Sequence, residues 1–307
     1  MTISSGFSVV TGAYGYTGKY IARLLLARGE RTATLTAHPN RPNEFGSLLP
    51  ALPMCFDDIS ALTDSLRGAH TLYNTYWVRF DHGTRTYERA IVNTRALFAA
   101  ARNAGVQRIV HVSITNPSLD SPLPYFRGKA LLEDEIQQSG LSYAILRPAV
   151  IFGAEDILIN NIAYFLRRLP LFLIPGSGRY RLQPIFAEDL AHLAVQAGQS
   201  DTNLVLDAVG PEIFSFNDLV SVIAATVKSR AKIVHCPASP AFTLIRLLSV
   251  VLGDVVLTLD ELKGLRADLL VSHAAPTGTT RLSKWLEENA DSVGSSYASE
   301  LKKHYRG

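Results

Sequence analysis

Cysteine is scarce in this chain: only Cys55 and Cys236 occur in 307 residues. The two lie far apart and in no CxxC or Cys/His arrangement, so we expect free thiols in a reducing cytosol rather than a disulfide framework. The eight histidines also lack the spacing of metal ligands, and no metal site is predicted. The sequence therefore predicts neither a small disulfide-stabilised protein nor a zinc-binding module.

Charge of either sign is also low. Charged residues make up 19% of the chain, the formal net charge is +3, and no block of lysines or arginines occurs. A nucleic-acid partner is therefore not expected. Because 47% of the residues are hydrophobic, the chain can bury a large core, and an intrinsically disordered protein is not expected.

Long hydrophobic runs are missing as well. No basic region precedes the short run FSVV near the start, so no signal peptide is expected and a cytoplasmic location is predicted. The stretch AFTLIRLLSVVLGDVVLTL at 241–259 is interrupted by Arg246, Gly253 and Asp254. We interpret it as two packed helices rather than an integral membrane segment, with a peripheral membrane contact as the alternative.

What is present is an alternation of strand-like and helix-like segments. Apolar, β-rich runs occur at 6–12, 31–37, 70–76, 108–113 and 142–148, with helical patterns between several of them. Such an alternation predicts an α/β protein of the Rossmann type, with a doubly wound parallel sheet and helices on both of its faces.

The alternation weakens near residue 210, where helical patterns follow one another with few strands between them. We therefore predict a dinucleotide-binding domain over 1–153, completed by about 180–209. The remaining segments, 154–179 and 210–307, are predicted to form a smaller, mostly helical C-terminal lobe that binds the substrate.

The segment TGAYGYTG at 11–18 places three glycines, Gly12, Gly15 and Gly18, between the first strand and the first helix. Glycines at such a turn allow a tight bend, a close approach of the backbone to a pyrophosphate, and close packing of the helix on the strand. The helix N-terminus then offers free N–H groups to the anion. This strand–turn–helix context predicts a dinucleotide site.

The end of the second strand bears on which dinucleotide binds. An acidic residue there would hold the ribose 2′-hydroxyl of NAD, but LTAHPNRP contains His38 and Arg41 and no acid before Glu44. Arginine suits a 2′-phosphate, so NADP(H) is favoured over NAD(H). The alternative is that Arg41 is an ordinary loop cation.

The segment PLPYFRGKALLEDE at 123–136 holds Tyr125 and Lys129 at the start of an expected helix. Four residues of separation place both side chains on one helical face. By itself this spacing fits an acid–base pair or two unrelated surface side chains.

Several motifs together resemble the extended or atypical short-chain dehydrogenase/reductases. The likeness is to the epimerase/dehydratase-like branch related to the nucleotide-binding accessory subunit of mitochondrial complex I, and it covers nearly the whole chain. The motifs are TGAYGYTG, FDDISAL, NTYW, Asn93 in the long helix, RIVHVS, YFRGK, LRPAVIFG and FAEDLA.

This resemblance implies a role for each matching residue. Tyr125 and Lys129 would be the catalytic YxxxK pair, in which the lysine holds the nicotinamide ribose and lowers the pKa of the phenol. Ser113 or Thr115 would orient the substrate oxygen, and the two stay as alternatives. The expected cofactor-binding residues are Gly12, Tyr14, Gly15, Tyr16, Thr17, Gly18, His38, Arg41, Asp57, Asp58, Asn74, Thr75, Lys129 and Pro148.

Two departures from the family pattern bear on the substrate. Sugar-nucleotide epimerases of the family carry an Arg-Asp pair where this chain has Leu182 and Gln183, so a UDP-sugar is not favoured. The segments NTYWVRFDHG and ILINNIAYFL suggest a partly apolar pocket for a small-molecule substrate. The expected substrate residues are Trp77, Phe80, Asn160, Asn161, Arg179 and Arg181.

Three functions are compatible with these features. The first is an NAD(P)-dependent oxidoreductase or epimerase that acts on a carbonyl or secondary alcohol. The second is a non-catalytic NADP(H)-binding sensor or assembly protein, as the complex I relative suggests. The third, a membrane-peripheral factor, depends only on the apolar segment 241–259. Oligomeric state and substrate identity do not follow from the sequence.

Overall fold

The computed structural model describes residues 6–305, and the chain divides into two compact units. Unit 1 contains the chain up to Pro148 together with Glu188–Asp207, and unit 2 contains Ala149–Ala187 and the chain from Ala208 onward. Residues 149–153, 180–187 and 208–209, which the sequence analysis assigned to the dinucleotide-binding domain, belong to unit 2.

Unit 1 is built on a seven-stranded sheet with the order β11-β6-β5-β4-β1-β2-β3. The strands are β1 (Phe7–Thr11), β2 (Thr32–Thr36), β3 (Ala51–Pro53), β4 (Ala69–Asn74), β5 (Arg108–Val112), β6 (Ser142–Pro148) and β11 (Leu204–Ala208). The pairs from β3 through to β6 are parallel. The strand order reverses between β1 and β4, and this is where doubly wound sheets bind their ligands.

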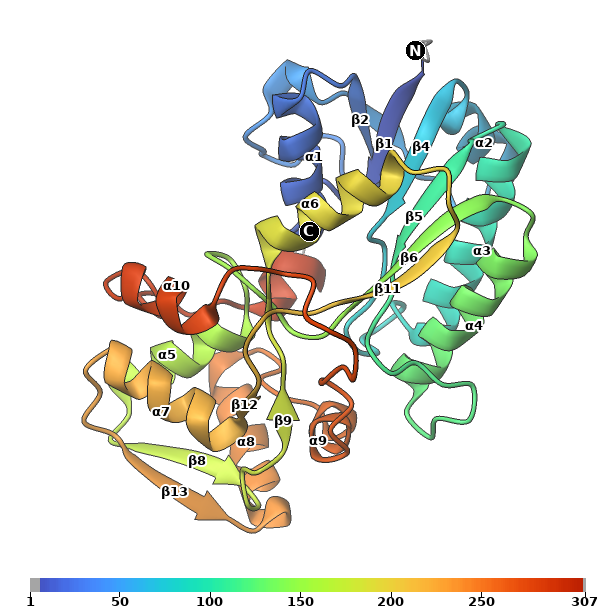
Figure 1. Cartoon of the computed structure of the whole chain (residues 1–307). Helices are drawn as coiled ribbons and strands as arrows, with labels where there is room; N and C mark the ends of the chain where they lie inside the picture. The colour runs from blue at the N-terminus through green and yellow to red at the C-terminus, as the bar shows by residue number, and fades with distance from the viewer. Residues whose placement is uncertain (1–5, 306–307) are drawn as a thin grey trace. The chain divides into compact units, whose positions relative to one another are not determined.

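The strands of this sheet are buried because helices cover both faces. Every residue of β2 and β5 is buried, which is typical of a parallel sheet enclosed on two sides. Figure 1 shows α2 (Ile59–Leu66), α3 (Tyr87–Asn103) and α4 (Pro124–Gln138) on one face of the sheet. The other face carries α1 (Thr17–Ala27) and α6 (Ala187–Gly198).

The core on the α2–α4 face combines apolar side chains from strands and helices, including Leu72, Leu97, Ile109 and Leu132, all fully buried. The predicted fold class is thereby confirmed: unit 1 is a Rossmann-type α/β structure. Elements expected from the apolar pattern lie within a few residues of their expected bounds; the helix expected over 84–104, for example, is α3.

Unit 2 contains most of the remaining helices and three short strand pairs. The helices are α5 (Leu158–Arg168), α7 (Phe216–Thr226), α8 (Ala238–Leu252), α9 (Leu259–Arg266) and α10 (Leu282–Glu288). The strand pairs are β7 (Ile151–Phe152) with β10 (Ile185–Phe186), β9 (Arg181–Leu182) with β12 (Phe214–Ser215), and β8 (Leu171–Pro175) with β13 (Lys232–Cys236). Its core packs Phe152, Leu219, Leu286 and Trp285 together.

The helices of unit 2 differ in how they begin. At α7 the Ser215 hydroxyl accepts a hydrogen bond from the Asp218 N–H at 3.1 Å. At α10 the preceding residue is Arg281, and no side chain caps the helix. The apolar segment 241–259 does divide at Gly253, whose φ of +60° ends α8.

Within residues 6–305, no helix is long and apolar enough to cross a membrane. The same residues contain no group of three or more His, Cys, Asp or Glu side chains placed to hold a metal ion. Cys55 and Cys236 are free thiols.

Candidate functional site

The turn after β1 has the backbone conformation that a phosphate-binding turn requires. Gly12 has a φ of +64°, a region that glycine adopts without strain, and its carbonyl accepts a hydrogen bond from the Gly15 N–H at 2.8 Å. A Cβ on Gly18 would lie 2.7 Å from the Gly12 carbonyl oxygen and 2.8 Å from that of Thr11. Gly18 is therefore needed for α1 to pack directly against the end of β1.

The first turn of α1 carries no negative charge of its own. Tyr16 precedes the helix without capping it through its side chain, and no acidic residue occurs in the first turn, which begins at Thr17. The helix N-terminus thus presents backbone N–H groups and a positive dipole end that suit a pyrophosphate. Tyr14 lies in the turn itself, with its hydroxyl donating to the Leu49 carbonyl at 3.3 Å.

The loop after β2 presents cations and no free carboxylate near the strand end. His38 and Arg41 are exposed, and the His38 N–H donates to the Thr36 hydroxyl at 3.0 Å. The nearest following acid, Glu44, forms a bidentate pair with Arg23 at 2.8 and 2.9 Å. This arrangement fits a 2′-phosphate better than a free 2′-hydroxyl, and the preference for NADP stays a prediction.

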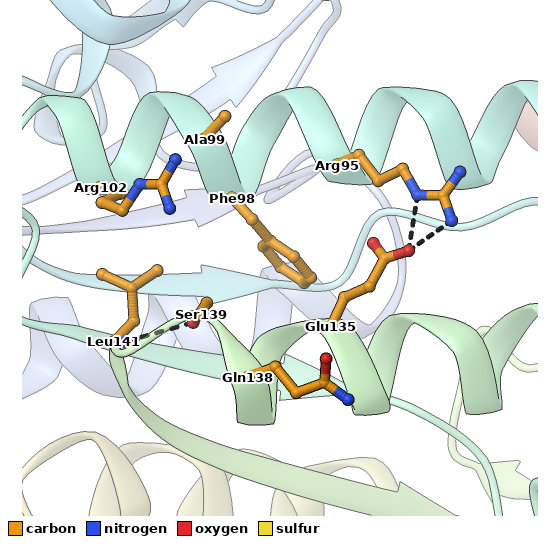
Figure 2. Close-up of a pocket in the computed structure, with 8 residues that line it drawn as sticks. All are labelled: Arg95, Phe98, Ala99, Arg102, Glu135, Gln138, Ser139 and Leu141. Atoms are coloured by element: carbon orange, nitrogen blue, oxygen red, sulfur yellow. Dashed lines mark hydrogen bonds and ion pairs between the residues drawn. The ribbon is translucent and has the colours of Figure 1, made fainter.

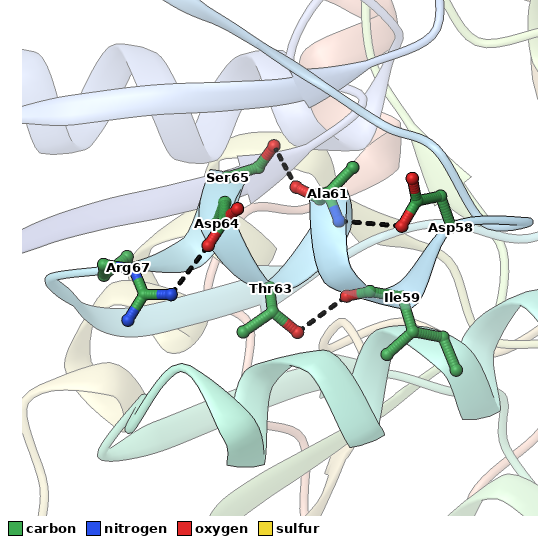
Figure 3. Close-up of polar contacts among 7 residues, drawn as sticks. All are labelled: Asp58, Ile59, Ala61, Thr63, Asp64, Ser65 and Arg67. Atoms are coloured by element: carbon green, nitrogen blue, oxygen red, sulfur yellow. Dashed lines mark hydrogen bonds and ion pairs between the residues drawn. The ribbon is translucent and has the colours of Figure 1, made fainter.

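Asp57 and Asp58, expected to bind the cofactor, both have partners within unit 1. Figure 3 shows Asp58 at the start of α2, where its carboxylate accepts a hydrogen bond from the Ala61 N–H at 2.9 Å. Asp57 is exposed and forms an ion pair with Arg89 of α3. Helix capping accounts for Asp58 without a ligand, so a cofactor contact of either residue stays a prediction.

Asn74 and Thr75 join the carboxyl end of β4 to that of β1, beside the glycine turn. The Thr11 hydroxyl donates to the Asn74 side-chain oxygen at 3.3 Å and accepts from the Thr75 N–H at 2.8 Å. The Thr75 hydroxyl in turn donates to the Thr11 carbonyl at 2.6 Å. The structure therefore brings two of the predicted cofactor residues to the point where the strand order reverses.

His111 is a buried residue of this site that the sequence analysis missed. Its Nδ1 lies 3.0 Å from the Asn74 amide nitrogen. Because that amide can only donate, Nδ1 is assigned as the acceptor and Nε2 carries the proton. Burial, and then the charge of Lys129, hold the pKa of His111 well below its usual range. A histidine inside the otherwise apolar strand RIVHV was the available signal.

Tyr125 and Lys129 converge on the indole ring of Trp77. The Lys129 ammonium lies 4.5 Å from the ring centroid, and the Tyr125 ring lies 5.8 Å from it, edge to face. Lys129 is fully buried and donates to the Val112 carbonyl at 2.8 Å. Burial lowers the pKa of Lys129 to about 7, although the charge of Glu133 opposes this shift.

Trp77 closes one side of this group. A Cβ on Gly128 would lie 3.0 Å from the indole, so glycine at that position lets the ring lie directly on α4. Tyr87 stacks on the other side at 6.2 Å. Phe80 is buried and lies 6.5 Å from the His82 ring, edge to face.

Three buried polar atoms here have no hydrogen-bond partner within residues 6–305: the Ser113 hydroxyl, the Trp77 indole N–H and His111 Nε2. Unpaired buried polar atoms are costly and often mark a ligand position. Ser113 lies just after β5, and its N–H donates to the Leu146 carbonyl at 2.7 Å. Thr115 is also buried, and its N–H donates to the Pro148 carbonyl at 2.9 Å.

The other four predicted substrate residues all lie in unit 2. Asn160 donates to the Asp156 carboxylate at 2.9 Å and accepts from the Gly294 N–H at 3.2 Å. Asn161 forms a two-way amide pair with the backbone of Ala298. Arg181 pairs with Asp268 at 3.2 Å, whereas Arg179 is exposed. Contact of any of them with a substrate stays a prediction.

A hollow on the surface of unit 1 lies apart from all of these residues. Figure 2 shows it between α3 and α4, where Arg95 donates to the Glu135 carboxylate at 2.7 Å. It contains none of the predicted site residues. Its lining is Arg95, Phe98, Ala99, Arg102, Glu135, Gln138, Ser139 and Leu141.

Comparison with protein families bears on this geometry. The model of an NAD(P)H-binding family matches residues 12–157, which include the glycine turn, the Tyr–Lys pair and the strand ends described above. Residues 12–157 therefore match an NAD(P)H-binding domain of the Rossmann type.

Individual relatives show which members of this group the chain resembles. The chain is 23% identical over 293 residues to NADH dehydrogenase [ubiquinone] 1 alpha subcomplex subunit 9, mitochondrial, of Arabidopsis thaliana, covering 89% of this chain and 73% of the relative. It is 28% identical over 259 residues to a ketoreductase of Stigmatella aurantiaca that acts on 4-hydroxy-2-methyl-3-oxo-4-farnesyl-3,4-dihydroquinoline-1-oxide, covering 76% of each chain. The resemblance to the complex I accessory subunit is confirmed.

Among solved structures, a nucleoside-diphosphate-sugar epimerase from Staphylococcus aureus superposes with a TM-score of 0.73. The match covers 92% of this chain and 99% of the epimerase, at 15% identity. At that identity the likeness shows the fold alone.

Proposed function

We propose that this protein is an NADP(H)-dependent oxidoreductase that acts on a carbonyl or secondary alcohol. The observation that carries the proposal is the convergence of Tyr125 and Lys129 on Trp77. Lys129 also binds the Val112 carbonyl, and the next residue, Ser113, has an unpaired buried hydroxyl. A phenol, an amine and a hydroxyl are the groups needed to bind a carbonyl oxygen and exchange a proton with it.

The roles of the residues follow from their surroundings. Lys129, with its pKa near 7, carries a variable positive charge that stabilises the phenolate of Tyr125 when present. Tyr125 would exchange the proton with the substrate oxygen, and Ser113 or Thr115 would orient that oxygen. The nicotinamide supplies the hydride chemistry when it is bound.

Residues of the glycine turn, the β1–β4 junction and the β2 loop would hold the cofactor. The conformation of Gly12, the close packing at Gly18 and the uncapped start of α1 all fit a pyrophosphate. Net redox change is favoured over sugar epimerisation, since the Gln183 amide is committed to the backbone of Gly210 and Ser272.

A second candidate is a non-catalytic protein that binds NADP(H) for sensing or assembly. Lys129 already donates to the Val112 carbonyl and lies over the Trp77 ring, which would fit a structural lysine. The mitochondrial NADH dehydrogenase subunit relatives also support this candidate. The two free cysteines favour a reducing cytosol as the compartment, with mitochondria as the alternative suggested by those relatives.

Two measurements separate the candidates. Purified protein is titrated with NADPH and with NADH by reduced-nicotinamide fluorescence, and the bound form is then given a panel of ketones and aldehydes. Oxidation of NADPH by any panel member supports the reductase. Tight binding without oxidation supports the sensor, and no binding of either nucleotide refutes both.

The role of Tyr125 is tested by Tyr125→Phe, with Tyr143→Phe on β6 as the matched control. Turnover should fall by about 100-fold or more in the first variant, because general acid–base catalysis contributes roughly that factor, while NADPH affinity changes little. The control should keep wild-type turnover. Equal turnover in the two variants would remove the acid–base role.

A further inference from the structure

Helix α8 of unit 2 exposes an apolar face. Four of its large apolar side chains are strongly exposed: Leu244 (47%), Leu247 (59%), Val250 (79%) and Val251 (82%). Their spacing places them on one side of the helix, since residues three, four and seven apart share a face. An apolar face of this kind on a folded protein usually marks a contact surface.

The rest of α8 is fixed to unit 2. Ala241 is fully buried, and the helix contacts β8. Asp254, just after the helix, accepts hydrogen bonds from the N–H groups of Glu300 and Leu301 at 2.9 Å each. The exposed face is therefore presented on an anchored helix rather than on a loose segment.

The two segments that supply β8, β13 and α8 contain cations and no acids, although Arg181 pairs with Asp268 of another segment. No acidic residue occurs between Asp156 and Glu188 or between Asp218 and Asp254, and those two segments contain eight Lys or Arg residues. The structure joins the segments through the parallel pair β8–β13. The cations are Arg167, Arg168, Arg179, Arg181, Lys228, Arg230, Lys232 and Arg246.

The strand pair that α8 contacts also carries exposed apolar and cationic side chains. Leu171 of β8 pairs with Lys232 of β13, and Val234 follows two residues later, so all three belong to one face of the pair. The two apolar side chains are each 42% exposed, and Lys232 is exposed between them. Exposed apolar side chains interleaved with cations match the surface of an anionic lipid bilayer.

We propose that unit 2 docks on anionic membranes through the exposed face of α8 and the adjoining edge of β8–β13. The helix would lie in the plane of the interface, because its 15 residues are fewer than the roughly 20 that span a bilayer. Leu247, Val250 and Val251 enter the boundary between headgroups and acyl chains, and Arg246 of α8 and Lys232 of β13 meet the lipid phosphates. The proposal does not depend on turnover or on the nucleotide.

Vesicle co-sedimentation of the full chain tests the proposal, with vesicles of phosphatidylcholine alone and of phosphatidylcholine with phosphatidylglycerol. The wild-type protein should sediment with the mixed vesicles, and less so as salt is raised, because surface charge attraction is screened. The double variant Leu247→Glu/Val251→Glu should reduce this binding by about tenfold or more, since two buried apolar contacts are replaced by anions.

The matched control is Val92→Glu, which places an acid at a 52% exposed apolar position on α3 of unit 1. It should sediment like wild type, and NADPH binding should be retained in all variants, which shows that unit 1 is folded. Absence of binding to mixed vesicles refutes the proposal, as does equal binding by the double variant. A dimer in solution that the double variant dissociates, without vesicle binding, would instead assign the face to a second copy of the chain.

Discussion

Lys129→Met tests the energetic cost of the buried lysine. Burial lowers the pKa of this amine from its ordinary 10.5 to about 7. Each unit of pKa difference corresponds to about 1.4 kcal/mol, so the buried amine lowers the free energy of unfolding by roughly 5 kcal/mol at pH 7. Methionine has a similar length and can pack on the Trp77 ring.

The variant also loses the hydrogen bond to the Val112 carbonyl, which costs about 1–3 kcal/mol when that acceptor stays buried. We therefore expect the free energy of unfolding of unit 1 to rise by about 2–3 kcal/mol at pH 7, while NADPH binding weakens. The substitution would thus increase stability and reduce activity.

The sign of the pH dependence follows from the same pKa. Between pH 7 and 10.5 the unfolded chain holds the Lys129 proton and the folded chain does not, so the stability of the wild-type protein rises with pH in this range. The methionine variant lacks this contribution. The difference in free energy of unfolding between the variant and the wild-type protein should therefore shrink by roughly 3 kcal/mol between pH 7 and pH 9.5.

Urea unfolding at the two pH values measures the effect. Trp77 and Trp285 are the two tryptophans, one in each unit, so fluorescence in a Trp285→Phe background follows unit 1. Lys19→Met on α1 is the matched control and should change the free energy of unfolding by less than about 0.5 kcal/mol at either pH. A Lys129→Met variant that is less stable at pH 7, or whose advantage does not change with pH, would refute the reasoning.

Three further outcomes are expected. Gly18→Ala should destabilise unit 1 by about 1–3 kcal/mol in urea unfolding and weaken NADPH binding, because its Cβ would lie 2.7 Å from the Gly12 carbonyl oxygen. Arg41→Ala should weaken NADPH binding about tenfold and leave NADH binding nearly unchanged in fluorescence titrations. Equal losses of NADPH and NADH affinity would show that Arg41 does not contact the 2′-phosphate. Burial raises the pKa of Asp156 to about 7, so the stability of unit 2 should fall as pH rises from 4 to 7, and Asp156→Asn should remove that slope in Trp285-monitored unfolding.

The sequence predicted unit 1 well because its signals are local. FSVVTG followed by three spaced glycines specifies a strand, a turn with positive φ at Gly12 and a helix, and the structure has all three. The helix predicted over 84–104 follows from apolar periodicity and ends at Asn103. The helix expected to start near Tyr125 begins at Pro124. The fold class and the resemblance to complex I accessory subunits, both confirmed, depended on these local patterns.

Local patterns of this kind do not predict contacts between distant segments of the chain. Nothing near Trp77 in the sequence indicates that its ring lies on Lys129, and the apolar spacing of α5 does not reveal that Asn160 binds the backbone of Gly294. The β8–β13 pair was missed for a related reason: LFLIP is short, bordered by prolines, and its partner is a distant strand.

The interleaving of the two units has a consequence for synthesis on the ribosome. Unit 1 needs α6 and β11, which are translated only after the first part of unit 2. Unit 2 in turn uses Asn161 and Asp254 to bind the backbone of residues 298–301. Because domains fold as units during translation, the incomplete sheet of unit 1 must wait for residue 207, and the nascent unit 2 stays open until residue 301 has emerged.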